Sequence, residues 1–199
     1  SFSNSAAHRV VVRSSFFIIL IACLTAPQQG LTQANVQRPD AIAILDIDAH
    51  HGDGTENLTA ENSNVLSFSI HEKGIFPGTG SNSIPEKLVY NYPLGAEGTE
   101  GEIGKGDEAL LRGVAEFCRL ADEFNADLIF VAAGADGHVE DPLSSLEYSV
   151  AGYSSVAKLI RKHFSDTPIL MGGAGGYLPD TRTPEVWASF AQSISQTEG

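Results

Sequence analysis

ILDIDAHHGDGT, residues 44–55, places three aspartates and two histidines directly after an apolar run. That run, AIAILDI at 41–47, is short, apolar and rich in isoleucine, which predicts a buried parallel strand. Side chains alternate along a strand, so Asp48 and His50 are expected to point the same way, with Asp46 before them. Carboxylate and imidazole groups together suit zinc or another divalent transition metal. The stretch therefore predicts a metal site at the end of a strand.

The remainder of the chain alternates between strand and helix patterns. Three further apolar runs that end in polar or glycine-rich sequence are predicted strands: 64–70, 126–134 and 167–173. Two segments with helical spacing of apolar residues are predicted helices: 105–124, for which Asp107 is the expected N-cap, and 146–164. This alternation predicts an α/β fold with three layers, in which a mostly parallel sheet has helices on both faces. In such sheets ligands bind beyond the carboxyl ends of the strands.

Composition limits the classes of function. The 199 residues are enough for one sizeable core, and a net charge of −13 argues against direct binding to nucleic acid while suiting a cationic partner. Cys23 and Cys118 are far apart in the sequence, which argues against a disulfide framework and a cysteine zinc site.

Residues 1–38 differ from residues 39–199, and we predict an atypical N-terminal segment followed by one α/β domain. Two arginines precede the apolar stretch 16–24, an order typical of a secretory signal. Nine apolar residues are too few to span a bilayer, and a helix or strand packed against the domain explains them equally well. We expect a cytoplasmic or nuclear protein, with secretion or an organelle left open by this segment.

A second acidic segment strengthens the metal prediction. VAAGADGHVEDP, residues 131–142, places Asp136 at the end of another predicted strand. Asp48, His50 and Asp136 would leave coordination positions open for water and substrate, as catalytic metal sites do. Taken singly, such residues have ordinary explanations: Asp46 could cap a helix, and His51 could be a buried histidine with satisfied hydrogen bonds.

Four segments together resemble the histone deacetylase family, which includes bacterial acetylpolyamine amidohydrolases and acetoin-utilisation proteins. They are ILDIDAHHGDGT, SFSIHEKGIFPGTG, AAGADGHVEDPL and MGGAGGY, and they lie in order within residues 41–190. The third segment is closer to the class II and bacterial branch than to class I. The resemblance implies the arginase/deacetylase fold and a zinc-dependent amidohydrolase. Its expected substrates are acetyl-lysine in histones or other proteins, or acetylated polyamines, with chromatin regulation among its roles.

The resemblance also implies roles for individual residues. Asp48, His50 and Asp136 would bind one catalytic zinc ion. Asp46, Ser69 and Ile70 would help to hold a structural potassium ion. Tyr177, which follows the glycine run, would donate a hydrogen bond to the oxyanion that forms during hydrolysis. Phe76 and Gly175 would line the narrow channel that admits the acyl-lysine stem. A tyrosine considered alone is more often part of a core than a catalyst.

Departures from the family pattern leave two other hypotheses open. Family members carry a pair of adjacent histidines well upstream, one acting as general base, whereas residues 1–43 contain only His8. We therefore expect the N-terminal part of the domain to be missing and residues 1–199 on their own to be inactive, so a non-catalytic binding module is one alternative. An arginase-like ureohydrolase with two metals is the other. It is disfavoured because Gly52 and His138 stand where further carboxylates would be needed.

Overall fold

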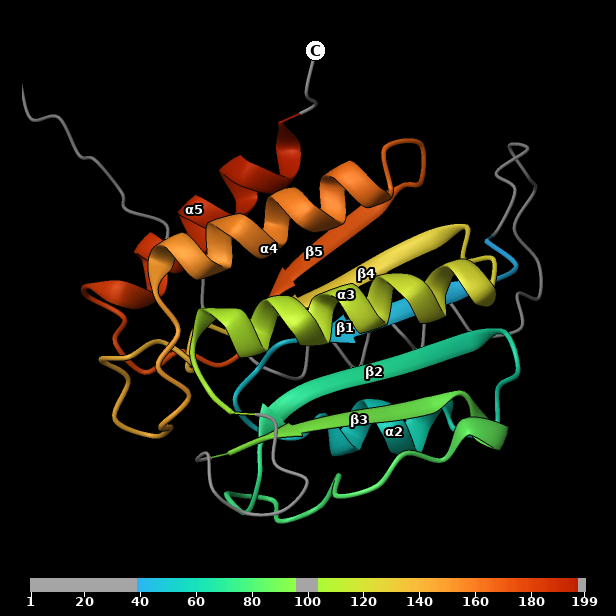
Figure 1. The fold of residues 1–199 in the computed structure, drawn as a ribbon, viewed down its shortest axis with the longest axis horizontal. Coiled ribbons are helices and arrows are strands. Elements are labelled where there is room, and N and C mark those ends of the chain that lie inside the picture. The colour runs from blue at the N-terminus through green and yellow to red at the C-terminus, as the bar shows by residue number, and fades with distance from the viewer. Residues whose placement is uncertain (1–38, 96–103, 197–199) are drawn as a thin grey trace, which may run out of the picture.

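The computed structural model describes residues 39–95 and 104–196, which form a single parallel sheet covered by helices (Figure 1). Its strands run in the spatial order β3-β2-β1-β4-β5. Their bounds are β1 Ile42–Asp46, β2 Val65–Glu72, β3 Val89–Leu94, β4 Leu128–Ala133 and β5 Ile169–Gly173. All four pairings are parallel, which confirms the predicted α/β class.

The central strand β1 contributes side chains to both faces of the sheet. Ala43 and Leu45 belong to the main core, whereas Ile42 and Ile44 belong to a smaller cluster with Val65 and Phe130. This alternation is the expected consequence of the two-residue period of a strand. Because β1 is buried throughout, its neighbours fix its position, and the residues that follow it leave the sheet at a defined point.

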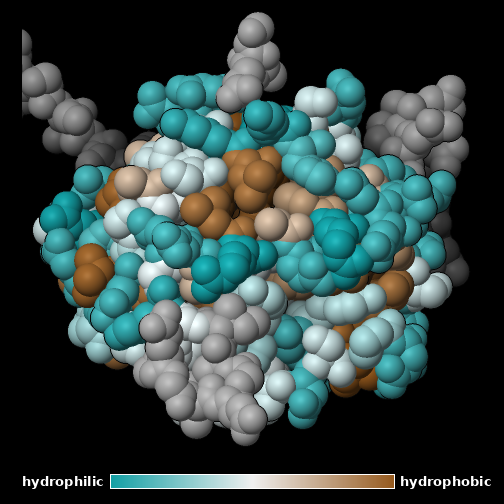
Figure 2. Space-filling view, viewed as in Figure 1, coloured by the Kyte–Doolittle hydropathy of each residue, from teal (hydrophilic) through white to brown (hydrophobic). Residues whose placement is uncertain are grey.

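Helices cover the two faces unequally in the part of the chain that is described. The helices α3 (Asp107–Glu123) and α4 (Val150–His163) lie side by side over one face, and α5 (Arg182–Ser195) packs against α4. The short helix α2 (Asp53–Thr59) lies behind the sheet in Figure 1. Figure 2 shows the α3 and α4 side of the molecule, where polar residues predominate and apolar ones gather over α4. None of the described helices is long and apolar enough to cross a membrane.

The predicted apolar face of the α3 segment is correct, but the predicted cap is wrong. Leu110, Val114 and Phe117 are fully buried, and the Phe117 ring meets Phe68 of β2 edge-on at 5.9 Å between centroids. Asp107 is not the N-cap, since Gly106 holds that position and no side chain caps the helix.

Asp107 instead joins the start of α3 to the start of α4. Its carboxylate accepts hydrogen bonds from the Ser149 N–H at 2.7 Å and the Ser149 hydroxyl at 2.6 Å. Ser149 is itself the N-cap of α4, and its hydroxyl oxygen accepts from the Gly152 N–H at 3.0 Å. Only the tertiary packing of the two helices could show this partner.

The sequence patterns did not predict β3, α2, α5 or the 3-10 turn Pro85–Lys87. The edge strand β3 is mostly half-buried and contains Pro93, so it lacks the apolar run typical of a central strand. Residues 96–103 lie outside the described part of the chain. The prediction for the segment 1–38 likewise concerns residues that are not described.

Candidate metal centre

The loop that follows β1 is shaped by carboxylates that accept backbone N–H groups. The N–H of Asp48 donates to Asp46 Oδ1 at 3.0 Å, and the N–H of His50 donates to Asp48 Oδ1 at 2.9 Å. From the segment that follows the neighbouring strand β4, Asp136 Oδ1 accepts the Ala49 N–H at 2.8 Å. These bonds turn the chain tightly at the carboxyl edge of the sheet and direct the Asp48 and His50 side chains towards Asp136.

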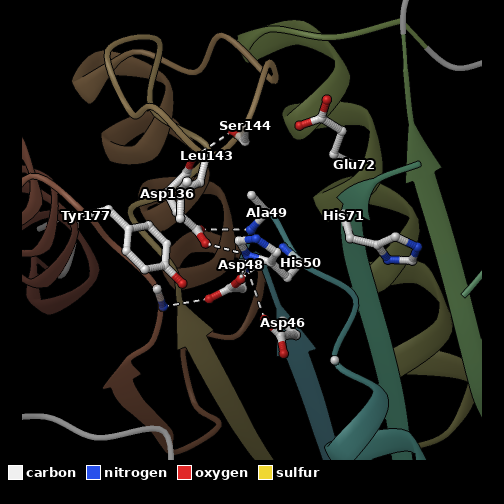
Figure 3. Close-up of polar contacts among 12 residues, drawn as sticks. Asp46, Asp48, Ala49, His50, His71, Glu72, Asp136, Leu143, Ser144 and Tyr177 are labelled. Carbon is white, nitrogen blue, oxygen red and sulfur yellow. Dashed lines mark hydrogen bonds and ion pairs between the residues drawn. The ribbon is translucent and has the colours of Figure 1, made fainter. Parts of the chain in front are cut away.

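Asp48, His50 and Asp136 converge on one point (Figure 3). His50 Nδ1 lies 3.1 Å from Asp48 Oδ1 and 2.9 Å from Asp136 Oδ2. One ligand atom from each residue lies within 4.8 Å of the other two. The three residues thus meet as the sequence predicted, and the donor set of one nitrogen and two oxygens fits zinc or a similar divalent ion.

The electrostatics of the group also fit a cation. Hydrogen bonds to Asp136 and then to Asp48 raise the pKa of His50 to about 10. Burial raises the pKa of Asp136 to about 7, although its hydrogen bond with His50 opposes this. Burial alone would raise the pKa of Asp48, but hydrogen bonds from His50 and from backbone N–H groups lower it overall. The Nδ1 atom of His50 thus lies within hydrogen-bonding distance of both carboxyl groups, and the three side chains together could hold one metal ion.

Tyr177 lies beside this group, on the segment that follows β5. Its ring meets the His50 ring edge-on, with centroids 6.1 Å apart, and Figure 3 shows its hydroxyl directed towards Asp48. Burial, followed by the charges of Asp136, Asp48 and Asp141, raises the pKa of the Tyr177 phenol. The hydroxyl is therefore protonated at neutral pH and can donate a hydrogen bond.

Gly175 brings the same segment into direct contact with the carboxylates. Its N–H donates to Asp48 Oδ2 at 2.5 Å, and its carbonyl accepts the Ala135 N–H at 2.6 Å. A Cβ atom at this position would lie 2.2 Å from Asp136 Oδ2. The approach is possible only because the residue has no side chain.

The three residues expected at a potassium site lie next to the metal centre. Burial, followed by the charge of Asp48, raises the pKa of Asp46 well above its usual value. Ser69, which pairs with Asp46 in the sheet register, accepts the Gly52 N–H at 3.2 Å through its hydroxyl. Ile70 is the next residue of β2 and is fully buried. Asp46, Ser69 and Ile70 thus lie together on two neighbouring strands, β1 and β2.

The ordinary explanation of His51 is correct. Its ring is buried, with Nδ1 2.8 Å from Thr79 Oγ1 and Nε2 3.1 Å from Glu56 Oε2. Its ring also lies 4.7 Å from that of His71, a buried histidine that the sequence analysis did not single out. Burial, and then the charge of His51, lowers the pKa of His71 to about 4.

Three exposed apolar side chains lie on loops of the chain. Phe76, on the loop after β2, is 81% exposed, and Tyr177 is 47% exposed. Leu143, which the sequence analysis missed, is 49% exposed and lies near Asp136 in Figure 3. The sequence feature that could have indicated Leu143 is an apolar residue directly after a proline in an otherwise polar loop. Glu72, also missed, accepts both the N–H and the hydroxyl of Ser145, which ties β2 to that loop.

Comparison with known proteins identifies the family. The model of the histone deacetylase domain matches residues 21–194. The chain belongs to the histone deacetylase family. Histone deacetylase 14, chloroplastic, of Arabidopsis thaliana is 37% identical over 167 residues, covering 78% of this chain and 37% of its own length. The acetoin utilization protein AcuC of Bacillus subtilis is 31% identical over 159 residues, covering 74% of this chain and 39% of its own length.

Solved structures of deacetylase-like proteins share the fold. An acetylpolyamine aminohydrolase from Burkholderia pseudomallei superposes with a TM-score of 0.69 at 23% identity, over 81% of this chain and 47% of its own. The HD domain of HDA15 superposes with a TM-score of 0.63 at 25% identity, over 78% of this chain and 44% of its own. This deacetylase-family chain therefore spans less than half the length of these four proteins.

Proposed function

We propose that this chain carries the metal centre of a zinc-dependent deacetylase that hydrolyses the amide of acetylated amines. The observation that carries the proposal is the convergence of Asp48, His50 and Asp136, with the Tyr177 hydroxyl directed at the same point. Membership of the histone deacetylase family supports it.

Each of these residues has a chemical task in the proposed reaction. Asp48, His50 and Asp136 would hold one divalent metal ion, which would polarise the amide carbonyl and acidify a water molecule. The protonated Tyr177 hydroxyl would donate a hydrogen bond to the same oxygen as negative charge develops on it. Gly175 packs its backbone directly against the two carboxylates, where a side chain would clash with them.

The exposed apolar residues suggest a channel for an aliphatic stem. We assign Phe76 and Leu143 to its walls, with Gly175 at its inner end. Apolar walls favour contact with the methylene groups of a lysine or polyamine, while the charged groups of the substrate stay in water. The net charge of −13 suits a cationic substrate of this kind. We therefore propose two substrates, acetyl-lysine in a protein and an acetylated polyamine. We do not propose a direct nucleic-acid partner.

A potassium ion is proposed beside the catalytic metal. Asp46, Ser69 and the backbone of Ile70 would contribute ligands to it. The pairing of Asp46 with Ser69 in the register of β1 and β2, with Ile70 next in the chain, supports this proposal.

One catalytic metal is favoured over the two of an arginase-like enzyme. In residues 39–95 and 104–196, Asp48, His50 and Asp136 are the one group of three or more metal-capable side chains. His138, which stands where a second carboxylate would be needed, is buried, and its Nδ1 accepts the Glu140 N–H at 3.1 Å. Gly52, the other position, has no side chain to offer.

Hydrolysis also needs a base for the water and a group that protonates the leaving amine. Among the described histidines, His50 alone bonds to Asp48 or Asp136, and we assign it to the metal. The family's upstream histidine pair has no counterpart in residues 1–43. We therefore expect residues 1–199 on their own to hydrolyse acetyl-lysine at no more than background rate. They should bind a metal only weakly, because Asp46 would lack the upstream histidine that it orients in the family.

The experiment compares two forms of the protein, the 199-residue chain and the longest polypeptide encoded by its gene. Each is loaded with zinc and assayed on an acetyl-lysine peptide and on an acetylated polyamine. We expect turnover in the longer form, lost in Asp136→Ala, and none above background in the 199-residue chain. Metal binding without turnover in both forms would favour the binding-module alternative. Turnover by the 199-residue chain that Asp136→Ala abolishes would contradict the expected inactivity.

The cell compartment is a separate proposal. The sequence led us to expect the cytoplasm or nucleus, but relatives from Arabidopsis thaliana and rice are designated chloroplastic. We therefore propose the plastid as an equal candidate, to be tested by imaging a fluorescent fusion of the longest polypeptide.

A further inference from the structure

Tyr177 follows a segment whose own sequence does little to fix it. Four of the five residues from 172 to 176 are glycines, which have the largest backbone freedom in an unfolded or loosened chain. Tyr177 is 47% exposed, so packing restrains its side chain only in part. The position of its hydroxyl therefore depends strongly on hydrogen bonds to the backbone around it.

Three side chains supply those hydrogen bonds. Asp48 accepts from the Gly175 N–H, and Thr183, at the start of α5, accepts from the Leu178 N–H at 3.1 Å. Between them, Asp141 Oδ2 accepts the N–H of Tyr177 itself at 2.9 Å. Asp141 is thus the side chain that holds the amide of Tyr177, and it lies outside the proposed ligand set.

Asp141 is well placed to act as a fixed point. It is 5% exposed, and its second oxygen, Oδ1, accepts the Leu143 N–H at 3.0 Å. Its own N–H donates to the His138 carbonyl at 2.8 Å. A buried carboxylate that accepts hydrogen bonds from two N–H groups forms stronger, charge-assisted bonds than a neutral acceptor does. Loss of either hydrogen bond leaves a buried polar group without a partner, which is costly in free energy.

The loop that carries Asp141 is also the loop that carries Asp136. The Ser144 hydroxyl donates to the Asp136 carbonyl at 2.7 Å, which closes the loop on itself. Asp141 therefore ties Tyr177 and Leu143 to the backbone that positions Asp136. These two side chains are the proposed oxyanion donor and a proposed channel wall.

We propose that Asp141 is a positioning residue that holds the Tyr177 hydroxyl over the Asp48, His50 and Asp136 group. It acts through the Tyr177 N–H and touches neither substrate nor metal. The inference rests on the role proposed above for Tyr177. The alternative is that Asp141 merely stabilises the fold, in which case its loss would loosen the domain generally.

Amide hydrogen exchange on the 199-residue chain separates the two readings without any need for activity. In Asp141→Ala, we expect exchange in the segment 174–178 to accelerate about tenfold or more, as loss of one charge-assisted bond implies. Exchange in β1 and α3 should stay at the wild-type rate. Asp141→Asn keeps the shape but loses one acceptor, so it should show the same local change to a smaller degree.

The matched control is Glu140→Gln, which weakens an ion pair between the loop of Asp141 and Arg182, the first residue of α5, without touching Tyr177. It should leave exchange in 174–178 within about twofold of wild type. Equal acceleration in the control and in Asp141→Ala, or acceleration spread over β1 and α3, would overturn the proposal.

The second test measures the kinetics of the polypeptide that hydrolyses the substrate. Asp141→Ala should lower kcat about tenfold to hundredfold, because the hydrogen-bond donor Tyr177 is misplaced. In a Tyr177→Phe background it should cause no further loss of kcat. An equal loss in both backgrounds would contradict positioning through Tyr177. An inactive wild type would instead count against the proposed function, and the exchange result would still decide the role of Asp141.

Discussion

Replacing Gly175 by alanine tests the geometry of the metal centre directly. The added Cβ atom would lie 2.2 Å from Asp136 Oδ2 and 2.6 Å from Asp48 Oδ2. Both distances are far below van der Waals contact, so either the segment or the carboxylates must move. Neither carboxylate is free to do so, because Asp136 is fully buried and accepts the Ala49 N–H, while Asp48 accepts the N–H groups of His50 and Gly175.

The size of the effect follows from the cost of overpacking a closed site. One extra methyl group in such a place costs about 1–3 kcal/mol. If that strain falls on the ligand set, zinc affinity should weaken roughly tenfold to hundredfold, since about 1.4 kcal/mol corresponds to a factor of ten. The clash exists without a metal, because the added Cβ atom meets the two carboxyl groups of the folded chain. The substitution should therefore also lower the melting temperature of the metal-free chain by a few degrees, about 2–4 °C per kcal/mol.

The assay is titration of the purified 199-residue chain with zinc, followed by calorimetry, beside a thermal unfolding scan. Gly54→Ala is the matched control, because a Cβ atom there meets nothing within 4 Å and the residue lies in α2. It should bind zinc like wild type and be slightly more stable, as alanine is in a helix. Wild-type zinc affinity in Gly175→Ala would refute the reasoning, because it would mean that Asp48 and Asp136 are not held at the metal.

Three other predictions follow from the site and the helix cap. The pKa of His50 is raised to about 10 by its hydrogen bonds to Asp136 and Asp48, so its proton is bound at neutral pH and must leave when a metal binds. Zinc affinity should therefore fall about tenfold for each unit by which the pH is lowered between about 9 and 7. Calorimetry in different buffers should show that about one proton is released when zinc binds. A zinc affinity that does not change with pH would contradict this prediction. In the form that turns over, Tyr177→Phe should lower kcat about 10²–10³-fold with unchanged metal content, and loss of metal would indicate misfolding instead. Ser149→Ala removes the N-cap of α4 and the hydroxyl partner of Asp107, so it should cost about 1 kcal/mol in chemical denaturation, and an unchanged midpoint would contradict that role.

Much of the fold could be predicted because it depends on short-range patterns. The apolar runs at β1, β2, β4 and β5 and the helical spacing of α3 and α4 are properties of neighbouring residues, and the structure has all six elements. The elements that were missed lack such patterns. The edge strand β3 is mostly half-buried, and α2 is only seven residues long.

The residues of the candidate site divide in the same way. Asp48 and His50 could be chosen from the sequence because they follow one strand at alternate positions, and a strand sets that geometry locally. Asp136 could be proposed from its place after another strand, but its contact with His50 joins residues 86 positions apart. That contact exists because β1 and β4 are neighbours in register, with Asp46 beside Ala132.

The sequence by itself therefore determined which side chains could bind a metal and at which strand ends they stand. The tertiary structure alone decided what holds them there. Asp141 meets the Tyr177 amide across 36 positions, Glu72 meets Ser145 across 73, and Asp107 meets Ser149 rather than its own helix. Periodicity reports which way a side chain faces within its own element. It carries no information about which donor from a distant loop will reach a given carboxylate, because that depends on the packing of the whole sheet and its helices.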